Sequence, residues 1–202
     1  MSELTPDEPS SVSTVDEHDG GAPPPHTKRR KHLVFEWVII VIAAVLVSFL
    51  MRTFVVQTFF IPSASMEPTL QIGDRIIVSK LSVSLGTINR GDILVFKAPP
   101  AEHCGEVVTD LVKRVIGLPG DHLTSVGNTI YINGNKLAEP WTHTEPLGNP
   151  IGNVVVPANS YFMMGDNHAD SCDSRMWGSV PRSDIIGKVF VRIWPLSRIG
   201  FL

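Results

Sequence analysis

The chain has 202 residues, a formal net charge of −3 and a hydrophobic fraction of 43%. That length accommodates one ordinary domain with appendages or two small domains, and the charge pattern indicates no nucleic-acid partner. The two cysteines, Cys104 and Cys172, lie in no Cys-x-x-Cys or Cys/His arrangement, so we expect no zinc site and no cofactor.

The N-terminal segment is polar. Residues 1–27 carry Pro, Ser, Gly and acidic residues and almost nothing apolar. Such a segment cannot bury enough surface to offset the entropy of ordering it. We therefore interpret residues 1–32 as a disordered cytoplasmic tail that ends in the basic cluster Lys28-Arg29-Arg30-Lys31.

Residues 33–51 are apolar except for Glu36 and Ser48. A helix of this length rises close to ~30 Å, which is enough to cross the hydrocarbon core of a bilayer. Four basic residues precede the segment and only Arg52 follows it closely, which predicts a cytoplasmic N-terminus and an exported remainder. The sequence thus predicts one transmembrane anchor in the cell membrane. A cleaved secretory signal and a buried core helix are the alternatives.

Residues 53–202, which the predicted orientation places outside the cytoplasm, have the composition of a β-rich domain. Short runs of β-branched and aromatic residues lie between turn signals, at 75–78, 93–96, 129–132 and 189–193. Asn133-Gly134 is typical of a two-residue hairpin turn. The predicted fold class is mainly β, an antiparallel β-sheet domain preceded by one N-terminal transmembrane helix.

The segment 61–70 reads Ile-Pro-Ser-Ala-Ser-Met-Glu-Pro-Thr-Leu. Pro62 and Pro68 fix φ and restrict the residues before them, which makes the segment stiff and non-helical. A rigid backbone around a hydroxyl suits a nucleophile, because misplacement by about an ångström costs rate heavily. A Ser/Pro-rich turn at the exit of the helix is the structural alternative.

The segment 110–121 contains a lysine between apolar residues. On a strand of period two, Lys113 shares one face with Leu111 and Val115. Burial disfavours the ammonium and lowers its pKa from about 10.4, which a lysine general base near neutrality requires. The alternative is an edge-strand lysine whose amine reaches water.

The segment 163–175 is dense in carboxylates, hydroxyls and Arg175, which can orient neighbouring catalytic groups. A solvated acidic loop is one alternative, and a cation site formed by Asp166, Asp170 and Asp173 is another. The spacing does not follow the EF-hand pattern, and we expect no metal.

These segments, in this order, resemble the boxes of the bacterial type I signal peptidase family, which are serine proteases with a Ser/Lys dyad. Residues 62–70 resemble the nucleophile box, and Gly91-Asp92-Ile93-Leu94-Val95-Phe96 resembles the Gly-Asp-hydrophobic strand. Residues 113–121 resemble the lysine box, and residues 165–175 resemble the Gly-Asp-Asn…Ser-x-Asp-Ser-Arg box. The resemblance extends from the anchor to Val191.

The resemblance implies Ser65 as the acylated nucleophile and Lys113 as the general base. It implies that the Ser63 hydroxyl donates to the oxyanion beside the Ser65 N–H, and that Ser171 holds the lysine amine by a hydrogen bond. No Gly-x-Ser-x-Gly elbow is present, which disfavours a histidine triad.

Asp173 and Arg175, with Arg114 nearby, would form a supporting ion pair. The chain departs from the family at His168-Ala169-Asp170, which replaces a frequent Arg-Asp-Asn and removes any ion pair expected there. About 40 residues separate the lysine box from the last box, so we expect a reduced accessory subdomain at approximately 122–160.

The implied substrate is a preprotein whose extended signal peptide adds as a strand beside Ser65 and Lys113. The candidate substrate-binding residues, expected as walls of small apolar subsites, are Phe59, Ile61, Leu111 and Val112. The expected protein is therefore a membrane-bound serine endopeptidase that removes signal peptides after Ala-x-Ala through an acyl-enzyme.

Two other functions are compatible with parts of the pattern. One is a catalytically silent, membrane-anchored β domain that binds extended peptides. The other is a self-cleaving repressor-type Ser/Lys protease, which the anchor and the absence of a DNA-binding segment disfavour. A Cys104–Cys172 disulfide and two reduced thiols are both compatible with the sequence, and the oligomeric state is not predicted.

Overall fold

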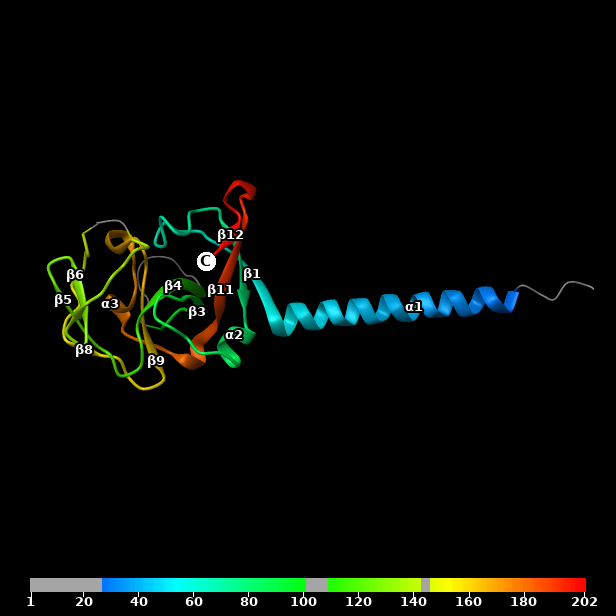
Figure 1. Cartoon of the computed structure of the whole chain (residues 1–202), viewed down its shortest axis with the longest axis horizontal. Helices are drawn as coiled ribbons and strands as arrows, with labels where there is room; N and C mark the ends of the chain where they lie inside the picture. The colour runs from blue at the N-terminus through cyan, green and yellow to red at the C-terminus, as the bar shows by residue number, and fades with distance from the viewer. Residues whose placement is uncertain (1–26, 101–108, 143–145) are drawn as a thin grey trace, which may run out of the picture. The chain divides into compact units, whose positions relative to one another are not determined.

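The computed structural model describes residues 27–100, 109–142 and 146–202, apart from the side chains of residues 27–33, 53 and 54. Most of the predicted tail, and Cys104 of the predicted disulfide, lie outside the described residues. The chain divides into two compact units, Met1–Ala44 and Val45–Leu202. Figure 1 shows one long helix and a β-rich domain.

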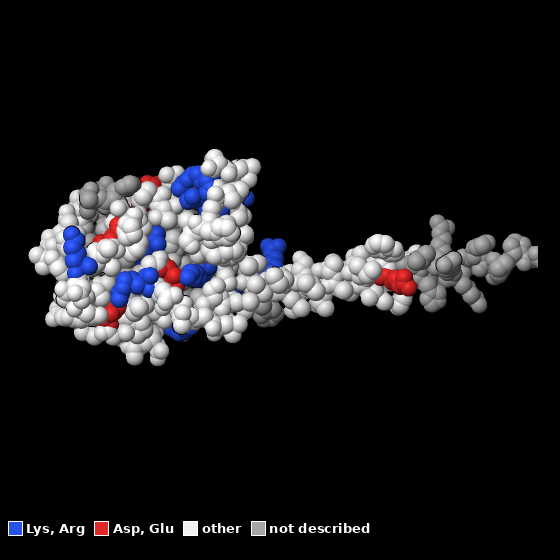
Figure 2. Space-filling model, viewed as in Figure 1, with Lys and Arg blue, Asp and Glu red and all other residues white. Residues whose placement is uncertain are grey.

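Helix α1 spans Thr27–Leu50 and continues into a π-helical turn, Met51–Val55. It begins earlier than the predicted segment 33–51 and takes in the basic cluster, because Lys and Arg are good helix formers. The side chains of residues 34–50 are exposed, and most of this surface carries no charge (Figure 2). Among the described residues, no helix meets the length and apolarity needed to cross a membrane. The structure therefore does not confirm the predicted transmembrane anchor.

The larger of the two sheets that the described residues form is antiparallel and has eight strands. In sheet order these are β1 (Val56–Phe60), β2 (Arg75–Ser79), β11 (Ile185–Trp194), β3 (Ile93–Lys97), β4 (Asp110–Gly117), β9 (Ser160–Met164) and β10 (Val180–Pro181), with β12 (Gly200–Phe201) paired to β11. Each of the four predicted strand runs lies within a strand of this sheet or of the second one. The predicted mainly antiparallel β fold is confirmed.

The second sheet has four strands in the order β7 (Asn135–Lys136), β6 (Thr129–Ile132), β5 (His122–Val126) and β8 (Val154–Val155). Figure 1 shows β5, β6 and β8 together at one end of the β-rich domain. Asn133 and Gly134 both have positive φ, 52° and 81°, as a type I′ hairpin turn requires. These strands fall within the range 122–160 expected for the accessory subdomain.

The remaining helices of the described chain are short. They are α2 (Leu81–Ser84), α3 (Ser174–Trp177) and the 3-10 turns η2 (His168–Asp170), η3 (Arg182–Asp184) and η4 (Leu196–Arg198).

Strand β4 lies where three apolar clusters meet. Val115 belongs to one cluster, Ile116 to the second, and Val112 packs against the third. Beyond them, Gly117 leaves no room for a side chain, because a Cβ there would lie 2.8–2.9 Å from side-chain atoms of Leu123, Val156 and Phe162. Full burial of each large apolar side chain contributes about 1.5–3 kcal/mol, so the three clusters hold β4 firmly in its place in the eight-stranded sheet.

Among the strand edges that have no partner within the described residues, two belong to β4 and β1. Strand β3 pairs with β4 along Asp110–Arg114, whereas β9 pairs with β4 only from Arg114 onward. The first half of β4 therefore has one edge without a strand partner. Strand β1 stands at the end of the sheet order and also has a free edge. These two edges flank the candidate site.

Candidate active site

The segment after β1 holds Ser65 in a backbone pinned at several points. The Ile61 N–H donates to the Asp74 carbonyl and the Gly73 N–H to the Ile61 carbonyl, both at 2.9 Å. Met66 and Leu70 are buried in the third cluster, and a Leu70 N–H bond to the Met66 carbonyl, also at 2.9 Å, closes the turn between them. Ser65 itself is 9% exposed.

The loop after β9 holds the same segment from the other side. The Asn167 N–H donates to the Ser65 carbonyl at 3.1 Å, and the Asn167 side chain donates to the Ala64 carbonyl at 3.4 Å. At Gly165 an added Cβ would overlap both the Ser65 carbonyl oxygen and Ser171 Oγ. Sequence reasoning did not assign a role to Gly165 or Asn167, although both lie in the Gly-Asp-Asn run.

The hydroxyls of Ser63 and Ser65 lie close together. Their Oγ atoms are 3.4 Å apart, which is longer than a usual O–H···O hydrogen bond. Both residues line one cleft. The Ser63 hydroxyl is therefore near the nucleophile without being committed to a strong bond with it.

Lys113 is a buried lysine with a lowered pKa. It is 3% exposed and stands opposite the fully buried Leu94 of β3. Desolvation by burial lowers the pKa of Lys113 from 10.5 to about 8, against the negative charge of Asp173, which raises it. The Lys113 Nζ donates to Ser171 Oγ at 3.0 Å. The amine is thus both desolvated and oriented by a hydroxyl.

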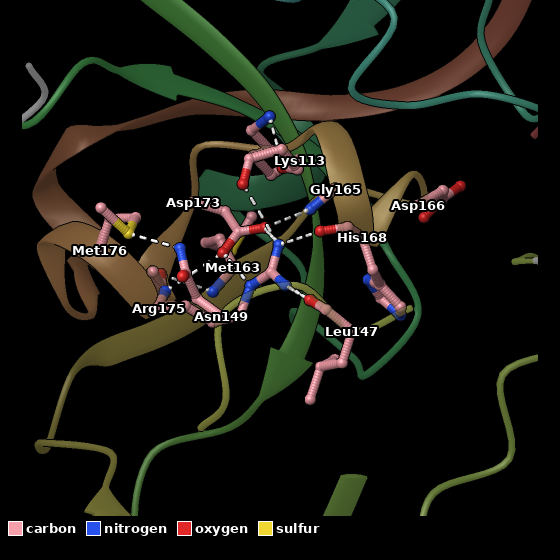
Figure 3. A network of polar contacts seen from close by, with 12 residues as sticks. Lys113, Leu147, Asn149, Met163, Gly165, Asp166, His168, Asp173, Arg175 and Met176 are labelled. Atoms are coloured by element: carbon pink, nitrogen blue, oxygen red, sulfur yellow. Dashed lines mark hydrogen bonds and ion pairs between the residues drawn. The ribbon is translucent and has the colours of Figure 1, made fainter. Parts of the chain in front are cut away.

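Asp173 and Arg175 form a buried ion pair with several hydrogen bonds (Figure 3). The Arg175 Nη2 lies 2.7 Å from Asp173 Oδ2, and Arg175 Nε donates to Oδ1 at 2.8 Å. Asp173 also accepts from the Gly165 N–H at 3.2 Å, and Arg175 donates to the carbonyls of His168 and Ser171. The pair therefore fixes both ends of the loop that carries Ser171.

Arg114 is not part of that pair. Its guanidinium binds Asp166 bidentately, with Nε to Oδ1 and Nη2 to Oδ2 both at 2.7 Å. The ring of Trp141 lies 4.7 Å from the guanidinium carbon. Arg114 points to the opposite face of β4 from Lys113 because neighbouring residues of a strand alternate. The expectation that Arg114 supports Asp173 and Arg175 is corrected accordingly.

His168, at the start of the departure from the family pattern, makes a different contact. Its Nε2 lies 3.0 Å from Glu139 Oε1, and both side chains are largely buried. The Glu139 segment is also joined to the loop by a Thr142 hydroxyl that donates to the Asp166 carbonyl at 2.6 Å. At this position of the loop, the chain therefore has a contact between His168 and Glu139.

A cleft of about 580 Å³ brings the predicted site residues together. The residues with proposed chemical roles that line it are Ser63, Ser65, Lys113 and Ser171. The predicted substrate-binding residues that line it are Phe59, Ile61, Leu111 and Val112, although Ile61 is also buried in the third cluster. Asn149, Asp170 and Met176 line the cleft as well, and sequence reasoning did not identify them as lining residues.

The comparisons with known proteins concern the chain as a whole. The family model described as signal peptidase, peptidase S26, matches residues 34–194. A probable signal peptidase I-2 from Synechocystis is 42% identical over 161 residues, which cover 80% of this chain and 73% of the relative.

Two further proteins extend the comparison. A signal peptidase IB from Staphylococcus aureus is 33% identical over 189 residues, covering 85% of this chain and 95% of the relative. A crystal structure of a signal peptidase I from Enterococcus faecalis aligns with a TM-score of 0.41 and 30% identity, over 50% of this chain and 96% of its own. On the family model and the identities to curated relatives, the chain belongs to the signal peptidase family, peptidase S26, a family of serine endopeptidases.

Proposed function

We propose that this protein removes signal peptides from exported preproteins with Ser65 as the nucleophile and Lys113 as the general base. One observation carries the proposal: a buried lysine whose pKa is lowered to about 8 lines the same cleft as a serine held in a pinned turn. A pKa near the working pH gives a base that is both available and strong enough to accept a proton.

Each proton has an assigned place in the mechanism. Lys113 Nζ takes the proton of Ser65 Oγ as the oxygen attacks the scissile carbonyl carbon. When the C–N bond breaks, the lysine ammonium returns that proton to the leaving amine, and the acyl group remains on Ser65. Lys113 then accepts a proton from the water that hydrolyses the ester. The Ser171 hydroxyl, bonded to Nζ at 3.0 Å, keeps the amine aimed into the cleft.

The tetrahedral oxyanion needs donors that are already in place. The Ser65 N–H and the Ser63 hydroxyl are the candidates, because the Ser63 Oγ lies 3.4 Å from the attacking oxygen. A preorganised donor of this kind contributes roughly 3 kcal/mol to the transition state. The role of the Ser63 hydroxyl predicts that its loss lowers kcat more than it raises KM.

Substrate binding follows from the unpaired strand edges. An extended signal peptide can add its backbone to the free edge of β4 beside Leu111 and Val112, facing the segment that follows β1. Phe59 and Ile61 form the other wall of the cleft. Apolar walls of this kind favour small side chains such as alanine, which is the basis for proposing cleavage after Ala-x-Ala.

We also propose that α1 attaches the protein to the cell membrane, with the catalytic domain on the extracytoplasmic side. The exposed apolar side chains of residues 34–50 and the preceding basic cluster support this proposal. Extraction of membranes with alkaline carbonate tests it. A protein that stays with the lipid is expected, whereas release into the supernatant would contradict attachment by an inserted helix.

The decisive experiment uses the full chain in detergent with a preprotein as the substrate. We expect the parent protein to cleave, and the Ser65→Ala and Lys113→Met variants to be inactive. Ser82→Ala is the matched control, because its hydroxyl lies outside the cleft and bonds Ser79. Cleavage by either cleft variant would exclude the proposed pair, and no cleavage by the parent would favour a silent peptide-binding domain.

A further inference from the structure

The residues that line the cleft fall into two groups. Beyond Ser65 and Lys113 on the signal-peptide side lie residues 59–62 and 110–112. A second group of lining residues, outside those two segments, includes Asn149, Asp170 and Met176 together with the residues next to Asp170. If the signal peptide lies along residues 59–62 and 110–112, the residues after the scissile bond lie along the group that contains Asp170 and Met176.

Asp170 lies close enough to Lys113 for its negative charge to raise the pKa of the lysine. Asp170 precedes Ser171, whose Oγ is 3.0 Å from Lys113 Nζ. Consecutive Cα atoms are about 3.8 Å apart, and an extended peptide advances about 3.3 Å per residue. The carboxylate therefore lies within reach of the first three residues after the cleavage site.

The charge of Asp170 is not compensated by a bonded cation. Asp170 is exposed, and within the described residues its carboxylate makes no hydrogen bond or ion pair. Lys113 is the one cation among the residues that line the cleft, and it is uncharged when it acts as the base. During catalysis the mature side of the cleft thus carries a negative charge that faces the substrate.

A flexible apolar wall stands beside this charge. Met176 of α3 is 59% exposed and accepts a hydrogen bond from the Asn149 amide at 2.8 Å (Figure 3). An unbranched thioether adapts to ligands of different shape, and the stem of a lysine or arginine packs well against such a surface. The apolar surface of Met176 and the carboxylate of Asp170 together suit a long side chain that ends in a positive charge.

Resting on the proposed function, we propose that Asp170 and Met176 form a subsite for the first residues of the mature protein. This subsite favours lysine or arginine and disfavours aspartate or glutamate. Asp170 acts on specificity, through the charge of the substrate, and is not required for the chemical step.

The test measures kcat/KM for peptides that share one Ala-x-Ala signal region and carry Lys, Gln or Glu at each of the first three positions after the cleavage site. At low salt we expect kcat/KM for the Lys peptide to exceed that for the Glu peptide by roughly five-fold at the most sensitive position. This is the size of effect expected for one partly exposed charge pair. Gln should lie between them, and high salt should reduce the ratio.

Three variants separate this role from others. Asp170→Asn should bring the Lys-to-Glu ratio close to one, whereas Asp110→Asn, which removes the carboxylate on the signal-peptide side, should leave it unchanged. Met176→Ala should lower the rates for Lys and Gln peptides more than for Glu peptides.

Each other outcome counts against the proposal in a recognisable way. Equal rates for Lys and Glu peptides in the parent would overturn the subsite while leaving the proposed function intact. If Asp170→Asn changes all peptides by the same factor, the carboxylate acts through the Lys113 amine and not through the substrate. If the parent cleaves no peptide, the proposed function itself fails, and the subsite fails with it.

Discussion

The buried lysine should make the protein less stable than it could be, and Lys113→Met tests this directly. Methionine is unbranched and has a similar length. On β4, opposite Leu94 of β3, its side chain can therefore fill the space of the lysine without carrying a charge. We expect the variant to be inactive and, at neutral pH, more stable than the parent. A catalytic group that costs stability is a common form of the trade-off between activity and stability.

The magnitude follows from the pKa of Lys113. The fall from 10.5 to about 8 means that burial disfavours the charged form by about 3 kcal/mol. Below pH 8 the folded protein must hold this ammonium, so the full cost is present there. Between pH 8 and 10.5 the unfolded chain binds more protons than the folded one, so stability rises with pH and the cost is lost. Loss of the bond to Ser171 offsets about 1 kcal/mol.

The net gain expected for Lys113→Met is therefore about 2 kcal/mol near neutral pH, and near pH 10.5 it turns into a loss of up to about 1 kcal/mol, because only the missing bond to Ser171 then counts. Urea unfolding of the full chain in detergent, followed by tryptophan fluorescence, measures it at both pH values. Lys188→Met is the matched control, because Lys188 forms a partly exposed ion pair with Asp92 and its removal should change stability by less than about 1 kcal/mol.

Two results would refute this reasoning. A Lys113→Met variant less stable than the parent near neutral pH would mean that the ammonium is stabilised where it lies. A gain of the same size at both pH values would mean that better packing, and not the removed charge, is responsible.

Three more predictions follow from the site. The kcat/KM of the parent should rise with pH through an apparent pKa near 8, as Lys113 loses its proton, and level off above it; a rate that falls over this range in a peptide assay would contradict the base. Asp173→Asn should destabilise the domain by about 3–5 kcal/mol in urea unfolding, because it leaves the buried guanidinium of Arg175 unpaired; a loss below 1 kcal/mol would show that water compensates the charge. Gly165→Ala should lower kcat about 100-fold by displacing Ser65 and its neighbours, whereas Gly152→Ala, with open space around its Cβ position, should not; similar rates for both variants would disprove the steric argument.

Local sequence signals predicted the strands well, because side-chain alternation and turn residues depend on neighbouring positions of the chain. Alternation placed Lys113 on the apolar face shared with Leu111 and Val115, and Asn133-Gly134 predicted a turn that needs two positive φ angles. The helix start was displaced to Thr27, since the pattern used for the prediction was apolarity and not helix propensity.

Contacts between distant segments could not be predicted from local patterns. Ser65 and Lys113 line one cleft, although the segment after β1 and strand β4 come from parts of the sheet that are not neighbours. Only the family resemblance indicated this. The close approach at Gly165 and the pairing of Arg114 with Asp166 depend on how loops cross, and alternation could show only that Arg114 and Lys113 point to opposite faces.

The two buried ion pairs explain how a costly lysine can be held in place. Lys113 resists burial in its charged form, so the segments around it need positions that do not depend on the lysine itself. Asp166 and Arg114 hold the far face of β4, while Asp173 and Arg175 hold the loop that ends at Ser171. Each pair is bonded on several sides, which a buried charge requires. It follows that the ion pairs should matter to folding even when Lys113 is replaced, so Asp173→Asn should remain destabilising in the Lys113→Met background.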